Sequence, residues 1–203
     1  MLPVADRKRT ERGTQVIEFS FFVLILVPLM LWVVVVGIDL GRAVRVAQVA
    51  RDAGSMWVRG VDFSQTGNQQ EIARLGASLG MAIPGTGAGA VYLSKVTYFA
   101  NGACTMPCNA GSYVLVQNDD IGDSSGLFPS HSVVLTAGTP TFDSEGNVLN
   151  YMTDSSAVVP GFENILTLNA NEFAYVSEAY FPSPLVNMPG FAMANANYSR
   201  TIF

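Results

Sequence analysis

The most continuous apolar pattern in the chain lies near its N-terminus. Residues 19–38 read FSFFVLILVPLMLWVVVVGI and contain no charged side chain. A helix rises about 1.5 Å per residue, so a segment of this length covers roughly the 30 Å hydrocarbon core of a bilayer. The alternative is a buried core helix, but such a helix is usually shorter and has a polar face. The pattern predicts a membrane-spanning helix.

The helical pattern continues beyond Ile38. Polar residues recur every three or four positions, which is typical of one face of a helix; they are Asp39, Arg42, Arg45, Gln48, Asp52, Ser55 and Arg59. Apolar or small residues lie opposite, among them Leu40, Val44, Ala47, Ala50 and Val58. The small residues Ala47, Ala50, Ala53 and Gly54 favour close packing against another chain or the protein's own sheet. We expect one transmembrane and stalk helix over residues 14–59.

The remainder, residues 60–203, is expected to form one extracytoplasmic α+β domain. A second helix is predicted over residues 69–82, ending before Pro84, and a glycine-rich linker follows it. Alternating Val, Tyr and Phe then predict strands at residues 91–99, 112–118, 131–136 and 172–181, with a turn at 143–147. The predicted fold class is α+β: a long N-terminal transmembrane and stalk helix, and a second helix packed on an antiparallel β-sheet.

Charge is distributed unevenly along the chain, whose formal net charge is −5. Four basic residues precede the apolar segment: Arg7, Lys8, Arg9 and Arg12. From residue 101 to residue 199 there is no Lys or Arg. Because basic flanks stay on the cytoplasmic side, we expect a single-pass inner-membrane protein with a cytoplasmic N-terminus and a periplasmic or extracellular C-terminal domain. The acidic exterior argues against a nucleic-acid partner.

Two cysteines, Cys104 and Cys108, lie close together in the segment CTMPC. Outside the cytoplasm, such a pair favours a disulfide over free thiols. A metal site is the third alternative, but two sulfurs supply only half of a tetrahedral zinc site and His131 is distant in the sequence. We therefore predict a disulfide and no metal.

Candidate catalytic groups are few. The only histidine, His131, is accompanied by no hydrolase motif. The acidic segment 118–123 offers oxygen ligands for calcium but lacks the ligand spacing of an EF-hand, so an acidic solvent loop is favoured. We expect neither an enzyme nor a cofactor; a membrane-anchored exported enzyme is the weakest alternative.

The segment before the apolar run resembles the prepilin peptidase site of type IV filament proteins. Gly13 stands at the position of the cut, Thr14 would become the first mature residue, and Glu18 would be the fifth. The resemblance implies that residues 1–13 are a leader. It also implies that Glu18 pairs with the free amine of Thr14 in a neighbouring subunit and sets the filament register. The alternative is that Glu18 is a headgroup-boundary carboxylate that favours the N-terminal end of the helix dipole.

The longer segment GTQVIEFSFFVLILVPLMLWVVVVGIDLGRAVRVAQVARDAG resembles the TadE/TadG family of tight-adherence pilus proteins. The features that carry the resemblance are Glu18-Phe19, the exit Gly37–Arg42 and the Ala-rich run 47–54; the segments EFAYVSEAYFPSPLV and ANYSRTIF match more loosely.

Membership of that family implies a minor pilin or pseudopilin that takes part in pilus assembly, adhesion and biofilm formation. The expected partners are a prepilin peptidase, other pilin subunits that contact the N-terminal helix, the inner membrane and a surface target. The alternative is an uncleaved membrane anchor that carries a binding or adhesion module.

Overall fold

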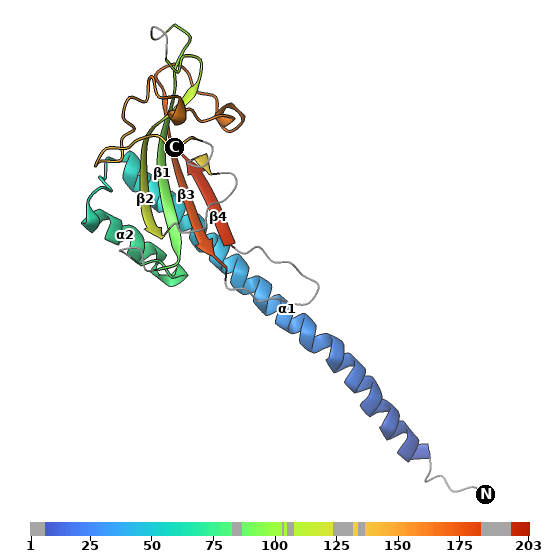
Figure 1. The fold of residues 1–203 in the computed structure, drawn as a ribbon. Coiled ribbons are helices and arrows are strands. Elements are labelled where there is room, and N and C mark those ends of the chain that lie inside the picture. The colour runs from blue at the N-terminus through green and yellow to red at the C-terminus, as the bar shows by residue number, and fades with distance from the viewer. Residues whose placement is uncertain are drawn as a thin grey trace, which may run out of the picture. The chain divides into compact units, whose positions relative to one another are not determined.

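The computed structural model describes residues 7–82, 87–102, 104, 108–123, 132–133, 137–183 and 196–203, with only the backbone for residues 7–13. The chain divides into two compact units, Met1–Gly41 and Arg42–Phe203. Helix α1 (Arg7–Val58) contributes residues to both units (Figure 1).

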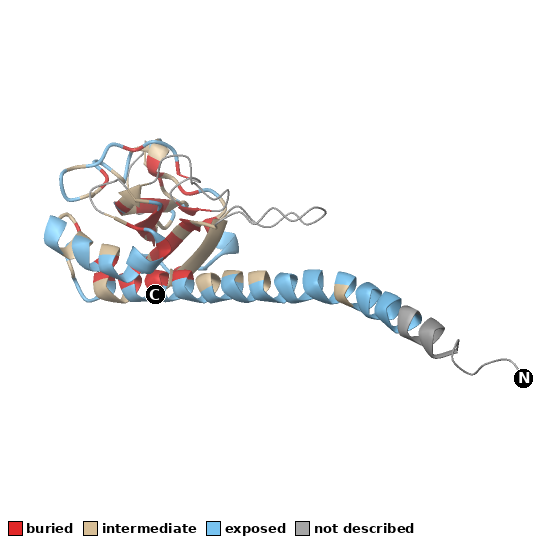
Figure 2. Cartoon of the chain, turned by 90° about the horizontal axis from the view of Figure 1, so that it is seen from below, coloured by how far each residue is buried: buried red, intermediate tan, exposed pale blue. Residues whose placement is uncertain are grey.

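The N-terminal unit is the first part of α1, and its apolar side chains face outward. Phe19, Phe21 and Leu24 are each about two-thirds exposed, at 68%, 67% and 71%. The most apolar 18-residue window has a mean hydropathy of 3.0, and none of it is buried (Figure 2). By length and composition this helix is sufficient to cross a membrane, as predicted.

The second unit is built on a four-stranded antiparallel sheet. Its strands are β1 (Gly89–Tyr98), β2 (Tyr113–Asp123), β3 (Phe173–Pro182) and β4 (Ala196–Ile202), in the order β2-β1-β3-β4. The register places Tyr92 of β1 and Arg200 of β4 on either side of Glu178 in β3. The predicted α+β class with an antiparallel sheet is confirmed.

Both α-helices and the segments that join them cover one face of this sheet. The C-terminal part of α1 packs on β1 and β3, together with α2 (Thr66–Gly76) and the short 3₁₀ helix η1 (Ala77–Leu79) (Figure 1). The buried residues of this first core include Val46, Val49, Ala50, Ala53, Trp57, Ile72, Leu79, Val91, Leu93, Ile121 and Phe181. The second helix begins three residues earlier than predicted and ends sooner, at Gly76; Pro84 lies outside the described residues.

Small residues let α1 approach the sheet closely. A Cβ atom on Gly54 would lie only 2.9 Å from the Cβ atom of Ser177, and closer still to the ring of Phe203. Ala50 and Ala53 are fully buried on the same face of the helix. These three positions therefore pack against the protein's own sheet, whereas Ala47, the fourth of the predicted small residues, is exposed.

The predicted apolar face of the stalk was partly wrong. Leu40, Val44 and Val58 were expected opposite the polar face, yet they are 65%, 52% and 43% exposed. The buried face instead passes through Val46, Val49 and Trp57, whose positions are offset around the helix. The sequence pattern is ambiguous here because both faces carry apolar residues, and only the sheet selects one of them.

The second face of the sheet is covered mainly by irregular chain, which contains the short 3₁₀ helices η2 (Ser155–Ala157) and η3 (Phe162–Asn164). Its core includes Val96, Val114, Leu115, Val133, Val148, Val159, Phe162, Leu168, Ala174 and Val176. The predicted turn at 143–147 is present, with the amide of Asp143 donating to the carbonyl of Asn147. This turn pairs with the outer edge of β2, where the amide of Val148 donates to the carbonyl of Val116. The edge strand is thereby covered over part of its length.

One predicted loop is a strand, one predicted strand lies mostly outside the described residues, and one strand was not predicted. The acidic segment 118–123 is not a loop, because β2 continues through it to Asp123. Of the predicted strand 131–136, only Ser132 and Val133 are described, and neither lies in a strand. The closing segment 196–202, which was not predicted as a strand, forms β4. Its alternation is weak, and its pairing with β3 is a long-range contact that local pattern does not reveal.

A carboxylate is completely buried in the middle of β3. Glu178 is 0% exposed and pairs with Arg200 of β4, whose Nε lies 3.0 Å from Oε1. The same carboxylate accepts hydrogen bonds from the Tyr198 hydroxyl, the Ser132 hydroxyl and the Val133 amide. Burial and then the nearby carboxylate raise the pKa of Tyr198, so this hydroxyl keeps its proton and donates. The network links β4 and residues 132–133 to β3.

We predict that Arg200→Ala lowers the free energy of unfolding by about 3–5 kcal/mol, because it leaves a buried carboxylate without its counter-charge. The measurement is denaturant unfolding of the detergent-solubilised chain, followed by near-UV circular dichroism. Arg74→Ala is the matched control, since Arg74 and its partner Glu71 are 72% and 52% exposed. Its loss should stay below about 0.5 kcal/mol. Equal effects of the two substitutions would contradict the structural role of the buried pair.

Candidate functional site

The predicted processing and register residues all lie on the first part of α1. Gly13 and Thr14 are within the helix, one turn before Glu18. Glu18 is exposed, and its neighbours Ile17 and Phe19 are 59% and 68% exposed. The hydroxyl of Ser20 is satisfied by the carbonyl of Val16 at 2.8 Å. Glu18 is thus an exposed carboxylate flanked along the helix by exposed apolar side chains.

The chemistry of Glu18 follows from these surroundings. A carboxylate next to an apolar membrane segment is costly unless a cation or hydrogen-bond donor compensates it. Among the residues that the structure describes, none forms an ion pair with Glu18. The Glu18 carboxylate is therefore suited to accept a cation or a hydrogen-bond donor from another molecule.

Arg42 marks where the chain enters the second unit. Its guanidinium donates to the carbonyl of Pro182, at the C-terminal end of β3, at 3.1 Å. Fifteen residues further along α1, the ring of Trp57 packs edge-on against Tyr175, near the N-terminal end of β3, with centroids 5.3 Å apart. Helix α1 therefore runs along β3, and the sheet has one end near Arg42 and another near Trp57.

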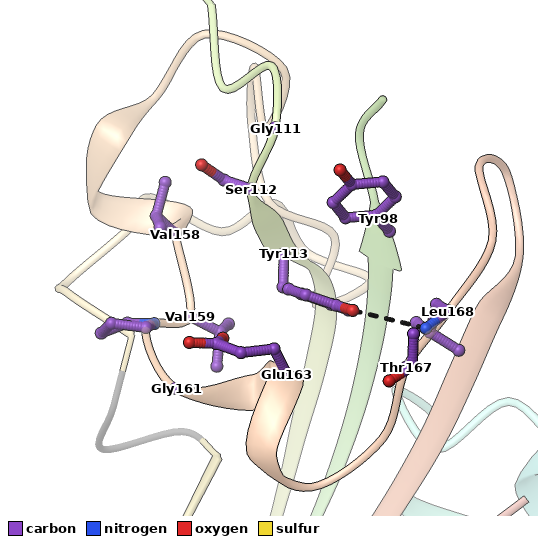
Figure 3. A pocket seen from close by; sticks show the side chains of 11 residues that line it. Tyr98, Gly111, Ser112, Tyr113, Val158, Val159, Gly161, Glu163, Thr167 and Leu168 are labelled. Carbon is purple, nitrogen blue, oxygen red and sulfur yellow. Dashed lines mark hydrogen bonds between the residues drawn. The ribbon is translucent and has the colours of Figure 1, made fainter. Parts of the chain in front are cut away.

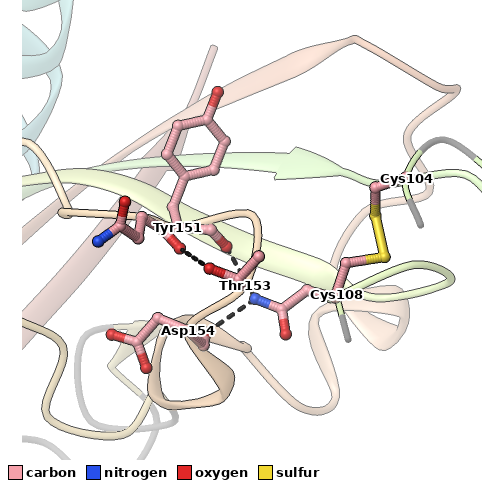
Figure 4. The surroundings of a disulfide bond; sticks show 7 residues. Cys104, Cys108, Tyr151, Thr153 and Asp154 are labelled. Carbon is pink, nitrogen blue, oxygen red and sulfur yellow. Dashed lines mark hydrogen bonds between the residues drawn. A yellow bond between two sulfur atoms is a disulfide. The ribbon is translucent and has the colours of Figure 1, made fainter. Parts of the chain in front are cut away.

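The disulfide lies in the loop between β1 and β2, as predicted. The Cα atoms of Cys104 and Cys108 are 6.3 Å apart and their sulfur atoms are bonded (Figure 4). The next residue, Asn109, is buried, and its amide side chain donates to the carbonyls of Tyr151 and Asp154, both at 2.7 Å. The loop is thus cross-linked to itself and tied to the turn at 150–154.

The acidic segment that suggested calcium is arranged differently from a ligand loop. Asp119 and Asp120 are successive residues of a strand, so their side chains point to opposite faces of the sheet. Asp119 is 9% exposed, while Asp120 is exposed and accepts a hydrogen bond from Asn118. Within the described ranges, no group of three or more His, Cys, Asp or Glu side chains is placed to hold a metal ion. His131 lies outside those ranges.

Asp119 is held in an unfavourable electrostatic environment. Burial, followed by the charges of Asp62, Asp120 and Asp143, raises the pKa of Asp119 to about 6. Hydrogen bonds from Ser64 lower the pKa of Asp62, and hydrogen bonds from Asn147 lower that of Asp143, so both stay charged. Gly146, at φ 77°, lies so close that a Cβ atom there would be 2.7 Å from Oδ1 of Asp119. The turn at 143–147 therefore packs closely against Asp119 and contributes one of these charges, that of Asp143.

Comparison with known proteins adds no further information about the site. No protein-family model, curated protein or solved structure matches the chain. The function must be inferred from the residues themselves.

We predict that Asp119→Asn makes stability less dependent on pH. The folded-state pKa of Asp119 is about 6 and its ordinary value is 3.8, so its ionisation destabilises the fold as pH rises from about 4 to about 7. The stability of the variant relative to the natural chain should therefore increase over this range, by at most about 3 kcal/mol.

The measurement is denaturant unfolding of both proteins at a series of pH values. Asp154→Asn is the comparator, because hydrogen bonds from Ser156 lower the pKa of Asp154, the opposite direction to Asp119. Its relative stability should not change between pH 4 and pH 7. If the difference in the free energy of unfolding between Asp119→Asn and the natural chain does not change over the same range, the pKa of Asp119 is not raised by the fold.

Proposed function

We propose that this chain is a TadE/TadG-like minor pilin or pseudopilin, a single-pass inner-membrane subunit that takes part in assembling or initiating a tight-adherence pilus. Residues 1–13 serve as its leader, and a prepilin peptidase cuts after Gly13. Glu18 then pairs with the amine of Thr14 in a neighbouring subunit. The C-terminal domain lies outside the cytoplasm and takes part in adhesion.

The observation that carries the proposal is the exposed apolar surface of α1 directly after an exposed carboxylate. The apolar window of this helix is unburied and sufficient in length and hydropathy for a membrane. The same surface suits packing against other apolar helices, because it presents apolar side chains on every side. Glu18 is the first charged residue beside it. The disulfide fits an oxidising compartment for the second unit.

We expect the mature protein to begin at Thr14. The N-terminus of the membrane-extracted protein is determined by mass spectrometry, with and without the cognate prepilin peptidase. A start at Thr14 that requires the peptidase supports pilin-type processing. A start at Met1 in both samples favours the alternative, an uncleaved anchor that carries an extracytoplasmic binding module.

We expect Glu18→Ala to leave membrane insertion intact and to remove the protein from sheared filaments, because the carboxylate compensates the amine of the next subunit. Immunoblots of membrane and filament fractions measure both properties. Ser20→Ala is the control, since Ser20 is a nearby polar residue whose hydroxyl bonds within its own helix. Normal incorporation of the Glu18→Ala protein would exclude a register role for Glu18.

A further inference from the structure

An open pocket of about 600 Å³ lies where β1 ends and β2 begins. Tyr113 stands at its centre, with Tyr98 and Ser112 on one side and Glu163 and Thr167 on the other (Figure 3). Pockets that bind small molecules commonly have volumes of roughly 300–1,000 Å³ and combine apolar walls with a few polar groups. This pocket has that composition, since Val158, Val159, Pro160 and Leu168 complete its wall.

The aromatic residues of the pocket form a supported row. The rings of Tyr98 and Tyr113 have centroids 5.1 Å apart, and Tyr113 is 5.3 Å from the ring of Phe162, which is fully buried. The Tyr113 hydroxyl also accepts a hydrogen bond from the amide of Leu168. Tyr98 is only partly buried, so its ring remains available at the wall of the pocket. The buried Phe162 holds the inner end of the row in place, and Tyr98 is accessible at its outer end.

The backbone around the pocket is already paired within the protein. The amide of Val159 donates to the carbonyl of Tyr113, and the amide of Gly111 donates to the carbonyl of Phe99. The amide of Ser112 bonds to the carbonyl of Asn109. A peptide that adds a strand needs free backbone groups at a sheet edge, and at Tyr113 the chain itself occupies that edge. At this edge, recognition therefore falls to side chains.

The charges in the pocket limit its ligand further. Among the described residues that line it, none is Lys or Arg, and Glu163 is the one acidic residue. An anionic ligand would meet a carboxylate without a counter-charge. Hydroxyls of Tyr98, Ser112 and Thr167, together with the Glu163 carboxylate, instead suit a ligand that carries many hydroxyl groups, because a carboxylate accepts strong hydrogen bonds from them.

We propose that this pocket binds a neutral sugar residue. The C–H groups on one side of a pyranose ring form an apolar face, which packs on the negative face of an aromatic ring such as Tyr98. The hydroxyls at the edge of the sugar reach Glu163, Thr167 and Ser112. The pocket lies at the end of the sheet near Trp57, away from Arg42 where the chain enters the unit. The proposal does not depend on cleavage of the leader or on entry into a filament.

The structure around the pocket supports binding without large rearrangement. The β1–β2 loop that supplies Gly111 and Ser112 is held by the buried Asn109, which directly follows the disulfide-bonded segment 104–108. The opposite wall begins at the bridge between Val114 and Val158. Rigid walls reduce the entropy lost when a ligand is ordered.

The test is saturation-transfer NMR with the full chain in an oligo-oxyethylene detergent, because sugar-based detergents belong to the ligand class being tested. The probes are glucose, galactose, mannose and N-acetylglucosamine, with sialic acid as an anionic probe and tetramethylammonium as a cationic one. We expect at least one neutral sugar to bind, with the strongest saturation on the C–H protons of one ring face. Sialic acid and tetramethylammonium should give no signal.

Variants of the pocket locate the binding site. Tyr98→Ala should weaken sugar binding by at least about tenfold, as expected for an aromatic anchor. Thr167→Phe should abolish binding by filling the pocket, and because Thr167 is exposed this variant should fold even if Tyr98→Ala does not. Glu163→Gln should weaken binding only a few-fold, since the amide oxygen still accepts. Glu145→Gln, an exposed site outside this pocket, is the control and should change nothing.

Three results would overturn the proposal. The first is that none of the neutral sugars binds the natural chain. The second is that sugar binding is unchanged in Thr167→Phe, which would place the site elsewhere. The third is that tetramethylammonium binds while the sugars do not and that Glu163→Gln abolishes this binding, which would make the pocket a site for organic cations.

Discussion

The close contact between the C-terminal part of α1 and the sheet is the interaction on which the second unit depends. Ala50, Ala53 and Gly54 bring the helix backbone near β3, and the ring of Phe203 lies against Gly54. A larger side chain at Gly54 would displace both β3 and the end of the chain. The first core, with Trp57 and the residues of α2, forms around this contact. The same helix therefore serves two environments: its second part packs on a sheet, while its first part exposes apolar side chains on all sides.

The second face of the sheet is organised around a polar centre. Glu178 belongs to β3, which lies between β1 and β4. Its buried carboxylate accepts hydrogen bonds from residues of β4 and from residues 132–133. A fully bonded polar group of this kind tolerates few alternative arrangements, because any change leaves a charge without its partner. Irregular chain between β2 and β3 covers the rest of this face and forms the pocket at the end of the sheet. The residues proposed for filament assembly and those proposed for sugar binding thus belong to different units of the chain.

Local patterns were sufficient for the elements whose periodicity is strong. The uninterrupted apolar segment and the spacing of polar residues after it indicated α1, and alternation indicated β1 and β3. Local patterns failed where a tertiary contact overrides composition. Asp119 and Asp120 were predicted to lie in a loop, yet they pair with Leu93 and Tyr92 of β1, so β2 extends through them. Apolar and polar residues alternate only weakly in residues 196–202, and this segment forms a strand because it pairs with β3.

Local patterns alone predict an apolar helix near the N-terminus, a basic segment before it, and the pairing of Cys104 with Cys108. These features are local, since they depend on side chains that are neighbours along the chain. Tertiary packing, by contrast, selects the buried face of α1, brings Glu178 to Arg200, and places Tyr98, Tyr113 and Glu163 around one pocket. These contacts join residues far apart in the sequence, so they are determined by the packing of the whole domain.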